Sequence, residues 1–238
     1  MPTTTVPPSW QTDLNVRATL QVQEYASIAD RIASDAPALL FDWGCGYGQM
    51  SDLLRQRGVA TTAYDYNGHL ADGELHPLEK YPHIEARYGD DGVRLPYADE
   101  SFDAALSCGV LEHVENPGGS LDELRRVLKA GGTLYVYKLP NRASWTEWVA
   151  RRCGGRLFYH GMAPHDHLYH LGEARELLER HGFHVSEASY ANVLPLMLPF
   201  SISAGATVRL WALNQRLSRV PGLRRIANNV ELVASTTG

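Results

Sequence analysis

The sequence has few of the features that would place it outside the cell or in a membrane. It has only three cysteines, Cys45, Cys108 and Cys153, which are far apart and odd in number. Such usage does not form a disulfide framework and is typical of a reducing cytoplasm. No run of about 18 apolar residues is present, so no segment predicts a membrane-spanning helix. The first ten residues, MPTTTVPPSW, lack a basic-then-apolar signal sequence, and we therefore expect a cytoplasmic protein.

An excess of positive charge is also absent. Lys and Arg number 22 against 27 Asp and Glu, which gives a formal net charge of −5. This balance disfavours nucleic acid as a partner, because phosphate backbones are bound mainly through Lys and Arg. The 238 residues are 44 % apolar and 21 % charged, which is typical of a soluble globular protein with one substantial core. We expect a single domain over residues 1–238.

Short apolar runs alternate along the chain with stretches of helical spacing. The runs predict strands at 38–43, 59–64, 83–88, 102–107, 133–139, 183–190 and 228–236. The helical spacing predicts helices at 14–34, 49–57, 119–129 and 172–181. Such alternation is typical of parallel strands joined by crossover helices. The predicted fold class is therefore α/β: a Rossmann-like three-layer α/β/α sandwich. Its seven-stranded sheet would be mostly parallel, with an antiparallel last strand beside 183–190.

Three segments fall outside this alternation. Residues 1–34 predict an N-terminal arm and helix, and 141–170 and 192–227 predict two cap insertions over the carboxyl edge of the sheet, where open α/β sheets bind ligands. The second insertion predicts a helix with an apolar stripe at Ala206, Leu210, Leu213 and Leu217, and it carries five arginines. Four roles stay open for it: core packing, a substrate lid, peripheral contact with a membrane, and a homodimer interface.

The stretch LLFDWGCGYGQM, residues 39–50, places three glycines directly after a buried-looking strand. A strand, a tight glycine turn and a helix are the architecture of nucleotide-binding α/β folds, because glycine allows positive φ and close approach of a ligand. A dinucleotide fingerprint needs a further glycine where Gln49 stands, and a phosphate-binding P-loop needs Gly-Lys-Ser/Thr, which is absent. Asp65 follows the next expected strand, where a carboxylate can accept hydrogen bonds from both ribose hydroxyls.

Four ordered motifs together resemble those of class I S-adenosylmethionine-dependent methyltransferases. They are DWGCGYG at 42–48, Asp65 at a strand tip, YGDDGVRLPYADESFDAALSCGVLEHV at 88–114, and LRRVLKAGGTLYVYKLPNR at 124–142. The third is similar to the small-molecule branch of the family that includes the quinone O-methyltransferases. The fourth has Ala130 where the family usually has proline. The resemblance is close over 38–142 and looser over 177–185.

The resemblance implies S-adenosylmethionine as the cofactor and assigns residues to its amino-acid tail. Asp42 would order the methionyl ammonium group, directly or through water. The other residues implied here, acting through their backbone, are Gly44, Cys45 and Gly46 in the glycine turn and Ser107 or Cys108 at the tip of the fourth strand.

The resemblance also assigns residues to the nucleoside. Asp65 would hold the ribose, and Tyr66 would cover one face of the adenine. Asp91 would accept a hydrogen bond from the adenine amino group, with Asp90 as the alternative. Gly92 would offer its backbone N–H to a ring nitrogen. Each of the aspartates could instead serve only as a turn or capping residue.

Methyl transfer also needs a group that accepts a proton. The sulfonium is already activated, so the protein must place the nucleophile and, for a hydroxyl, remove its proton. Histidine suits this task because it titrates near neutral pH. The candidates are His113, after the strand expected at 102–107, and His165 and His167 in the loop at 159–171. The alternatives are a helix-start role for His113 and a solvated loop for the other two.

The loop at 159–171 could also hold a divalent metal, because imidazole and carboxylate are adequate ligands. The family's metal carboxylates are not matched here, so we predict no metal site. The sequence lacks the motifs of amino-directed and cytosine-directed DNA methyltransferases. We therefore expect O-methylation of a small metabolite, such as a sugar, quinone or natural product, with a His base. The alternatives are C- or N-methylation of a small molecule or lipid, a non-catalytic methyltransferase-like scaffold, and a nicotinamide-dependent oxidoreductase.

Overall fold

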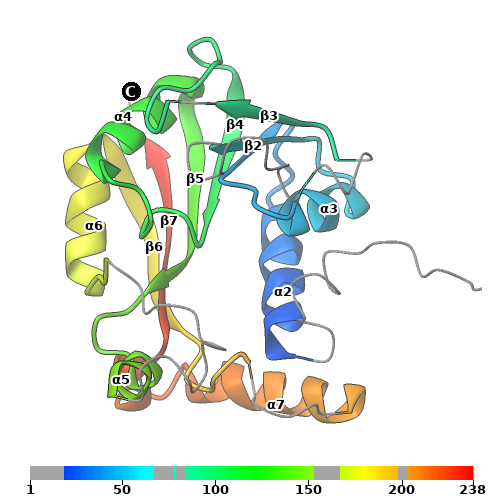
Figure 1. The fold of residues 1–238 in the computed structure, drawn as a ribbon, viewed down its shortest axis with the longest axis vertical. Coiled ribbons are helices and arrows are strands. Elements are labelled where there is room, and N and C mark those ends of the chain that lie inside the picture. Colours follow the sequence, from blue (N-terminus) through cyan, green and yellow to red (C-terminus); the bar gives the residue numbers. More distant parts are fainter. Residues whose placement is uncertain are drawn as a thin grey trace, which may run out of the picture.

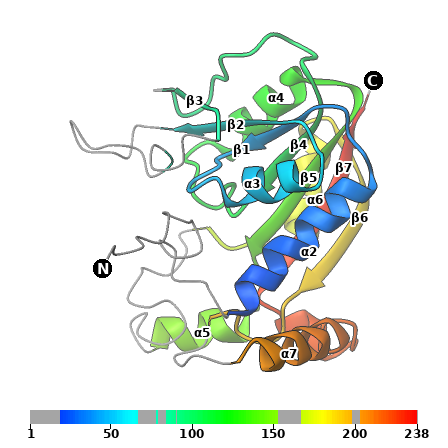
Figure 2. The ribbon, with the colours of Figure 1, turned by 90° about the vertical axis from the view of Figure 1, so that its right-hand side faces the viewer.

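The computed structural model describes residues 19–66, 78, 84–89, 91–152, 167–197 and 203–237. These residues form one seven-stranded sheet with helices on both faces (Figures 1 and 2). The strands are β1 (Leu40–Trp43), β2 (Thr61–Tyr66), β3 (Ala86–Gly89), β4 (Phe102–Cys108), β5 (Leu128–Pro140), β6 (Phe183–Ala191) and β7 (Asn229–Thr236). The helices are α2 (Leu20–Ser34), α3 (Gln49–Gln56), α4 (Pro117–Val127), α5 (Trp145–Arg152), α6 (Leu171–Arg180) and α7 (Ala204–Leu217), followed by the 3₁₀ helix η2 (Leu223–Ile226).

The strand order is β3-β2-β1-β4-β5-β7-β6. The first five strands of this order are parallel neighbours, and β7 runs antiparallel to both β5 and β6. The predicted fold class is confirmed, including the antiparallel last strand beside β6. Because β7 is reversed, the segment that joins β6 to β7 leaves and re-enters the sheet at the same edge, which is the carboxyl edge of the parallel strands.

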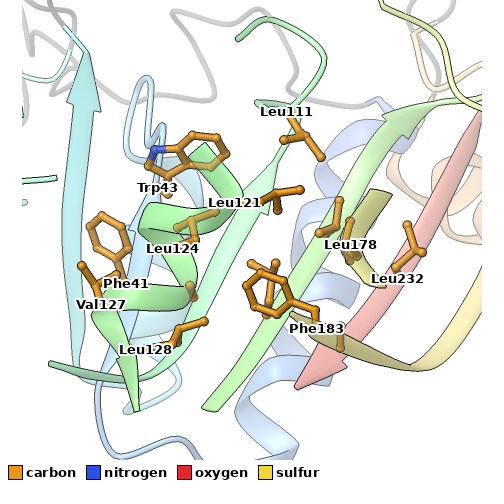
Figure 3. Packing of buried hydrophobic residues seen from close by; sticks show 14 of the residues in the cluster. Phe41, Trp43, Leu111, Leu121, Leu124, Val127, Leu128, Leu178, Phe183 and Leu232 are labelled. Atoms are coloured by element: carbon orange, nitrogen blue, oxygen red, sulfur yellow. The ribbon is translucent and has the colours of Figure 1, made fainter. Parts of the chain in front are cut away.

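The core lies in two layers, one on each face of the sheet. On one face, α2 and α3 contribute Ile28, Ile32 and Leu54 to a buried cluster. On the other face, Leu124 of α4 and Leu178 of α6 pack against the sheet (Figure 3). Successive residues of β4 serve the two layers in turn, as expected of a strand that is buried on both faces.

Several element ends differ from the predicted ones because contacts distant in sequence set them. The second strand begins at Thr61, two residues later than predicted, and continues through Tyr66 because Asp65 pairs with Tyr88 of β3. Helix α4 begins at Pro117, two residues earlier than predicted. The Asn116 side chain caps it by accepting a hydrogen bond from the Gly119 N–H at 3.0 Å, and proline suits the first helical position.

Helices α5 and α7 lie together at one end of the molecule, at the bottom of Figures 1 and 2. The predicted apolar stripe of the second insertion is wrong in one respect: Leu213 of α7 is exposed, at 43 %. The buried residues of this helix are Thr207 and Asn214. Asn214 faces inward because its side chain bonds to Asn192 and to the Leu194 N–H. The single-domain organisation and the cap roles of both insertions stay predictions.

Candidate active site

The glycine turn follows β1 and has little room for side chains. Gly44, Gly46 and Gly48 have φ of 70°, 53° and 72°, in the left-handed region that favours glycine. A Cβ on Gly44 would lie 2.6 Å from both methyl groups of Val110, and one on Gly48 would lie 2.5 Å from Leu78 Cδ1. A Cβ on Gly46 would meet only one atom, 4.0 Å away. Gly46 therefore faces open space while its two neighbouring glycines are packed against the core.

Asp65 at the end of β2 holds this turn in place. Its Oδ2 atom accepts a hydrogen bond from the Gly46 N–H at 2.8 Å, and its Oδ1 atom accepts one from the Tyr66 N–H at 2.8 Å. The N–H groups of Gly44 and Cys45 both donate to the Tyr64 carbonyl at 2.9 Å. These hydrogen bonds fix the Asp65 carboxylate beside the backbone of the turn. A ligand could therefore contact both groups at once.

Asp42 lies beneath the turn. Its side chain is buried, and its Oδ2 atom accepts a hydrogen bond from the Ser51 hydroxyl of α3 at 2.6 Å. Burial raises the pKa of Asp42 to about 6, although the Ser51 hydrogen bond acts in the opposite direction. Asp42 does not reach the cavity described below. The structure shows Asp42 hydrogen-bonded to Ser51 of α3. Its direct contact with a ligand stays a prediction.

Asp91 and Gly92 lie across from Tyr66. The Oδ1 atom of Asp91 accepts hydrogen bonds from the N–H groups of Val93 and Arg94, both at 2.8 Å, and these bonds lower its pKa. One carboxylate oxygen of Asp91 therefore stabilises the turn that follows it. A Cβ on Gly92 would lie 3.9 Å from the Tyr66 ring, so this glycine leaves the space beside the ring narrow but open. Asp90 lies outside the described residues.

These groups surround a cavity of about 870 Å³ at the carboxyl ends of β1, β2 and β4. The volume is within the usual range for small-molecule sites, about 300–1,000 Å³. Seven of the predicted site residues line it: Gly44, Gly46, Asp65, Tyr66, Asp91, Gly92 and His113. The lining residues not predicted from the sequence are Trp43, Tyr64, Val93, Leu95, Gly109, Val110, Val114, Glu115 and Asn116.

Two predicted cofactor residues are buried beside the cavity without lining it. The Cys45 side chain packs in the core, and burial raises its pKa well above the ordinary value, so it remains a thiol. The Ser107 hydroxyl is buried and makes no hydrogen bond with any residue that the structure describes. Both residues were predicted to act through their backbone, and that role stays a prediction.

Gln49, the first residue of α3, is a polar group that the sequence reasoning did not assign to the site. Its Oε1 atom is buried and has no hydrogen-bond partner in the described part of the chain. This oxygen is also the atom 4.0 Å from the Cβ position of Gly46. A buried acceptor without a donor is costly. The arrangement therefore fits a ligand that brings a donor, such as an ammonium group, to the glycine turn.

His113 lies after β4 on the cavity wall. Its side chain is 58 % exposed, and its Nε2 atom is 3.9 Å from the Oε1 atom of Glu112, whose side chain is 3 % exposed. The His113 N–H donates to the Val110 carbonyl at 2.8 Å, which fixes the backbone of this turn. An imidazole open to the cavity beside a buried carboxylate can take up a proton, because the carboxylate stabilises the imidazolium that results.

Neither of the other two histidine candidates is seen to line this cavity. His165 lies outside the described part of the chain, and His167 is exposed and does not line the cavity. His170 is at the start of α6, and its N–H donates to Glu173 Oε2 at 2.9 Å. Within the described ranges, no three His, Cys, Asp or Glu side chains are arranged to hold a metal ion. A base role for His165 or His167 stays a prediction.

Comparison with known proteins identifies the central part of this chain. The profile of a family described as "Methyltransferase domain" matches residues 41–136. The ubiquinone biosynthesis O-methyltransferase of Pseudomonas entomophila is 32 % identical over 107 residues, which are 44 % of this chain and 46 % of that relative. The chain matches about half of the length of such curated relatives or less.

Solved structures resemble the whole fold. The 1,6-didemethyltoxoflavin-N1-methyltransferase of Burkholderia thailandensis, bound to 1,6-didemethyltoxoflavin and S-adenosylhomocysteine, has a TM-score of 0.58 at 17 % identity, over 95 % of this chain and 82 % of that one. The protein bound to the Trm112 methyltransferase activator of Haloferax volcanii has a TM-score of 0.60 at 17 % identity, over 96 % of each chain. Identities this low show a shared fold.

Proposed function

We propose that the chain is a class I S-adenosylmethionine-dependent methyltransferase and that it transfers a methyl group to a hydroxyl oxygen of a small metabolite. The methyltransferase-domain profile over residues 41–136 supports the first part of this proposal. The observation that carries this proposal is the cavity at the carboxyl ends of β1, β2 and β4. It brings together the open Gly46, the Asp65 carboxylate and the Asp91–Gly92 turn, together with one histidine. The O-methyltransferase names of the relatives support oxygen as the accepting atom.

The nucleoside of S-adenosylmethionine fits the side of the cavity formed by the ends of β2 and β3. A carboxylate has about four acceptor positions, so Asp65 can accept from ribose hydroxyls while it holds Gly46 and Tyr66. The Oδ2 atom of Asp91 would accept from the adenine amino group, since Oδ1 serves the turn. The Tyr66 ring, which is exposed, would cover one adenine face.

The amino-acid tail fits the glycine turn. Gln49 Oε1 would accept a hydrogen bond from the methionyl ammonium, which satisfies a buried oxygen that has no donor among the described residues. The buried Asp42 would add a negative charge beneath the turn. The backbone of Gly46 allows close approach because only a hydrogen atom faces the open space.

When bound, S-adenosylmethionine supplies a methyl group that is already activated on its sulfonium. His113 would then take the proton of the acceptor hydroxyl as the new oxygen–methyl bond forms and the sulfur–methyl bond breaks. Glu112 would stabilise the imidazolium from 3.9 Å. The products are the methyl ether and S-adenosylhomocysteine, and the proton leaves His113 to solvent, because this side chain is largely exposed.

The proposal is tested with methyl-labelled S-adenosylmethionine and a panel of phenols, catechols and sugars, each paired with its amine analogue. Label is expected in hydroxyl acceptors and not in their amine analogues. His113→Ala should lower turnover by about 10²- to 10⁴-fold, the usual contribution of a general base, and leave cofactor affinity unchanged. His184→Ala, on the exposed side of β6, is the matched control.

Three results would contradict parts of this proposal. Transfer to amines alone would replace O-methylation by N-methylation. Full turnover of the His113→Ala protein across the pH range would place the base elsewhere, and His165 and His167 would be tested next. Cofactor binding without transfer to any acceptor in the panel would favour the non-catalytic scaffold.

A further inference from the structure

Exposed apolar side chains gather at one end of the molecule. The large apolar side chains that are exposed among the described residues are Tyr66, in the cofactor cavity, and six others on or near α5 and α7. Those six are Trp148, Val208, Leu213, Val220, Leu223 and Ile226. Helices α5 and α7 lie together in both views of the molecule (Figures 1 and 2). Apolar patches that persist on a soluble protein mark an interaction site more often than scattered single residues do.

The same end is basic although the whole protein is acidic. Residues 192–230 contain no Asp or Glu, whereas the full chain has a net charge of −5. The exposed cations of this segment are Arg209, Arg216, Arg219, Arg224 and Arg225. None of them forms an ion pair with another described residue, in contrast to surface arginines such as Arg57, Arg126 and Arg142, which do.

The outward face of α7 combines both kinds of residue. Val208, Arg209, Ala212, Leu213 and Arg216 are all exposed and recur with the spacing of a single helix face. The two buried residues of this helix, Thr207 and Asn214, are both polar. Asn214 ties the helix to the rest of the protein through hydrogen bonds with the Asn192 side chain and the Leu194 N–H. Helix α7 is thus held with apolar side chains toward solvent, an orientation that water alone disfavours. We refer to the exposed residues of 205–226 as the α7 surface.

Two of these arginines also line a second cavity. Arg219, Arg224 and Trp211 are among the residues that line a cavity of about 570 Å³ between α2, α7, β6 and β7. Arginine binds phosphate well because its guanidinium donates two parallel hydrogen bonds.

We propose that the α7 surface docks on a bilayer of anionic phospholipid. Interleaved arginines and branched apolar side chains on an exposed helix match a headgroup layer, where cations meet phosphates and apolar groups enter the acyl boundary. A nucleic acid would use the arginines and leave the apolar residues exposed. None of the described helices is long and apolar enough to cross a membrane. This proposal does not depend on the identity of the methyl acceptor.

The test is co-sedimentation of the full chain with vesicles of phosphatidylcholine alone and of phosphatidylcholine mixed with phosphatidylglycerol. Binding is expected only to the anionic vesicles. The triple variant R209Q/R216Q/R219Q should bind them on the order of 100-fold more weakly, since each arginine near the surface contributes roughly fivefold. V208S/L213S should weaken binding without any change of charge.

The matched control is R125Q/R175Q/R180Q, which removes the same charge from exposed positions on α4 and α6. It should bind like the wild-type protein. The proposal is overturned if the wild-type protein does not bind anionic vesicles, or if both triple variants lose the same affinity. A third result would also overturn the proposal. If the wild-type protein does not bind vesicles and light scattering shows a dimer that is lost in the V208S/L213S variant, a second copy of the chain covers this surface.

Discussion

Gly44 has two separate reasons to be glycine, whereas Gly58 has one. Both have positive φ, 70° and 80°, but a Cβ on Gly44 would lie 2.6 Å from Val110 while one on Gly58 would meet no atom within 4 Å. Gly44→Ala should therefore destabilise the protein by about 1–3 kcal/mol more than Gly58→Ala, the usual cost of overpacking. Urea unfolding of both variants measures the difference. Two results would show that Val110 can move away from the new methyl group. One is an equal loss of unfolding free energy in the two variants, and the other is a G44A/V110A double variant that regains none of the stability lost in G44A.

We expect Glu231, which is half-buried, to make the stability of the fold depend on pH. It lies on β7 and lines the second cavity, and burial together with the nearby Glu24 carboxylate raises its pKa from 4.5 to about 8. The folded protein therefore holds this proton more tightly than the unfolded chain does. Its contribution to stability is present at low pH and is lost as the pH rises from 4.5 to about 8.

Glu231→Gln should remove that dependence, because glutamine keeps the size of the side chain and does not titrate. The melting temperature of the variant should fall less than that of the wild-type protein between pH 5 and about 8. Thermal unfolding across this range measures both slopes. Identical slopes would mean that Glu231 titrates at its ordinary pKa in the folded protein.

At the scale of elements, one buried carboxylate connects four segments. Glu24 of α2 pairs with Lys138 of β5 at 2.6 Å and accepts hydrogen bonds from Asn229 of β7 and from Asn192 after β6. Asn192 in turn bonds to Asn214 of α7. The orientation of α7 is therefore determined through a polar network that also holds α2 against the sheet.

Lys138→Met should destabilise the protein by about 3–5 kcal/mol, because removing one partner of a buried pair leaves the other charge uncompensated. The double variant E24Q/K138M should lose less than K138M alone, since no buried charge then remains at the pair. Denaturant unfolding gives both values. A double variant that is less stable than K138M would show that the hydrogen bonds of Glu24, and not its charge, dominate this network.

The sequence predicts the end of a helix or strand correctly where residues close to that end determine it. The glycine turn placed the start of α3 correctly, because positive φ at Gly48 and the following helix are encoded within a few residues. The ends of β2 and β3 were misplaced because pairing between Asp65 and Tyr88, distant in sequence, determines them. The inward face of α7 was misassigned because Asn214 is buried by a partner 22 residues away.

The candidate site shows the same division. Asp65 and Gly92 were predicted because the motifs that contain them are short and ordered along the chain. The motif marks Gln49 only as the residue that replaces a glycine of the dinucleotide fingerprint, and it does not mark Val110. The roles of both residues arise from packing against the turn. Glu112 was not predicted as a partner of His113 because neighbours in sequence do not reveal which side chain is buried.

At the scale of the whole molecule, the proposed cofactor cavity and the α7 surface lie at one edge of the sheet. The cavity is at the carboxyl ends of β1, β2 and β4, and the segment between β6 and β7 lies at the carboxyl end of β6. This placement follows from the reversal of β7, because a hairpin-like connection returns at the edge where it left. A molecule presented at the α7 surface would therefore approach the edge of the sheet that carries the cavity.

The proposed function requires that the cavity at the carboxyl ends of β1, β2 and β4 binds S-adenosylmethionine through Asp65 and the glycine turn. Calorimetric titration with S-adenosylhomocysteine, the product that retains the nucleoside and the amino-acid tail, tests it most directly. We expect micromolar affinity for the wild-type protein and about 10- to 100-fold weaker binding for Asp65→Ala, since a hydrogen bond to a charged group contributes about 1.5–3 kcal/mol. Glu176→Ala, at an exposed position on α6, should bind like the wild-type protein. No binding at millimolar ligand, or equal affinity of the Asp65→Ala variant, would contradict the claim.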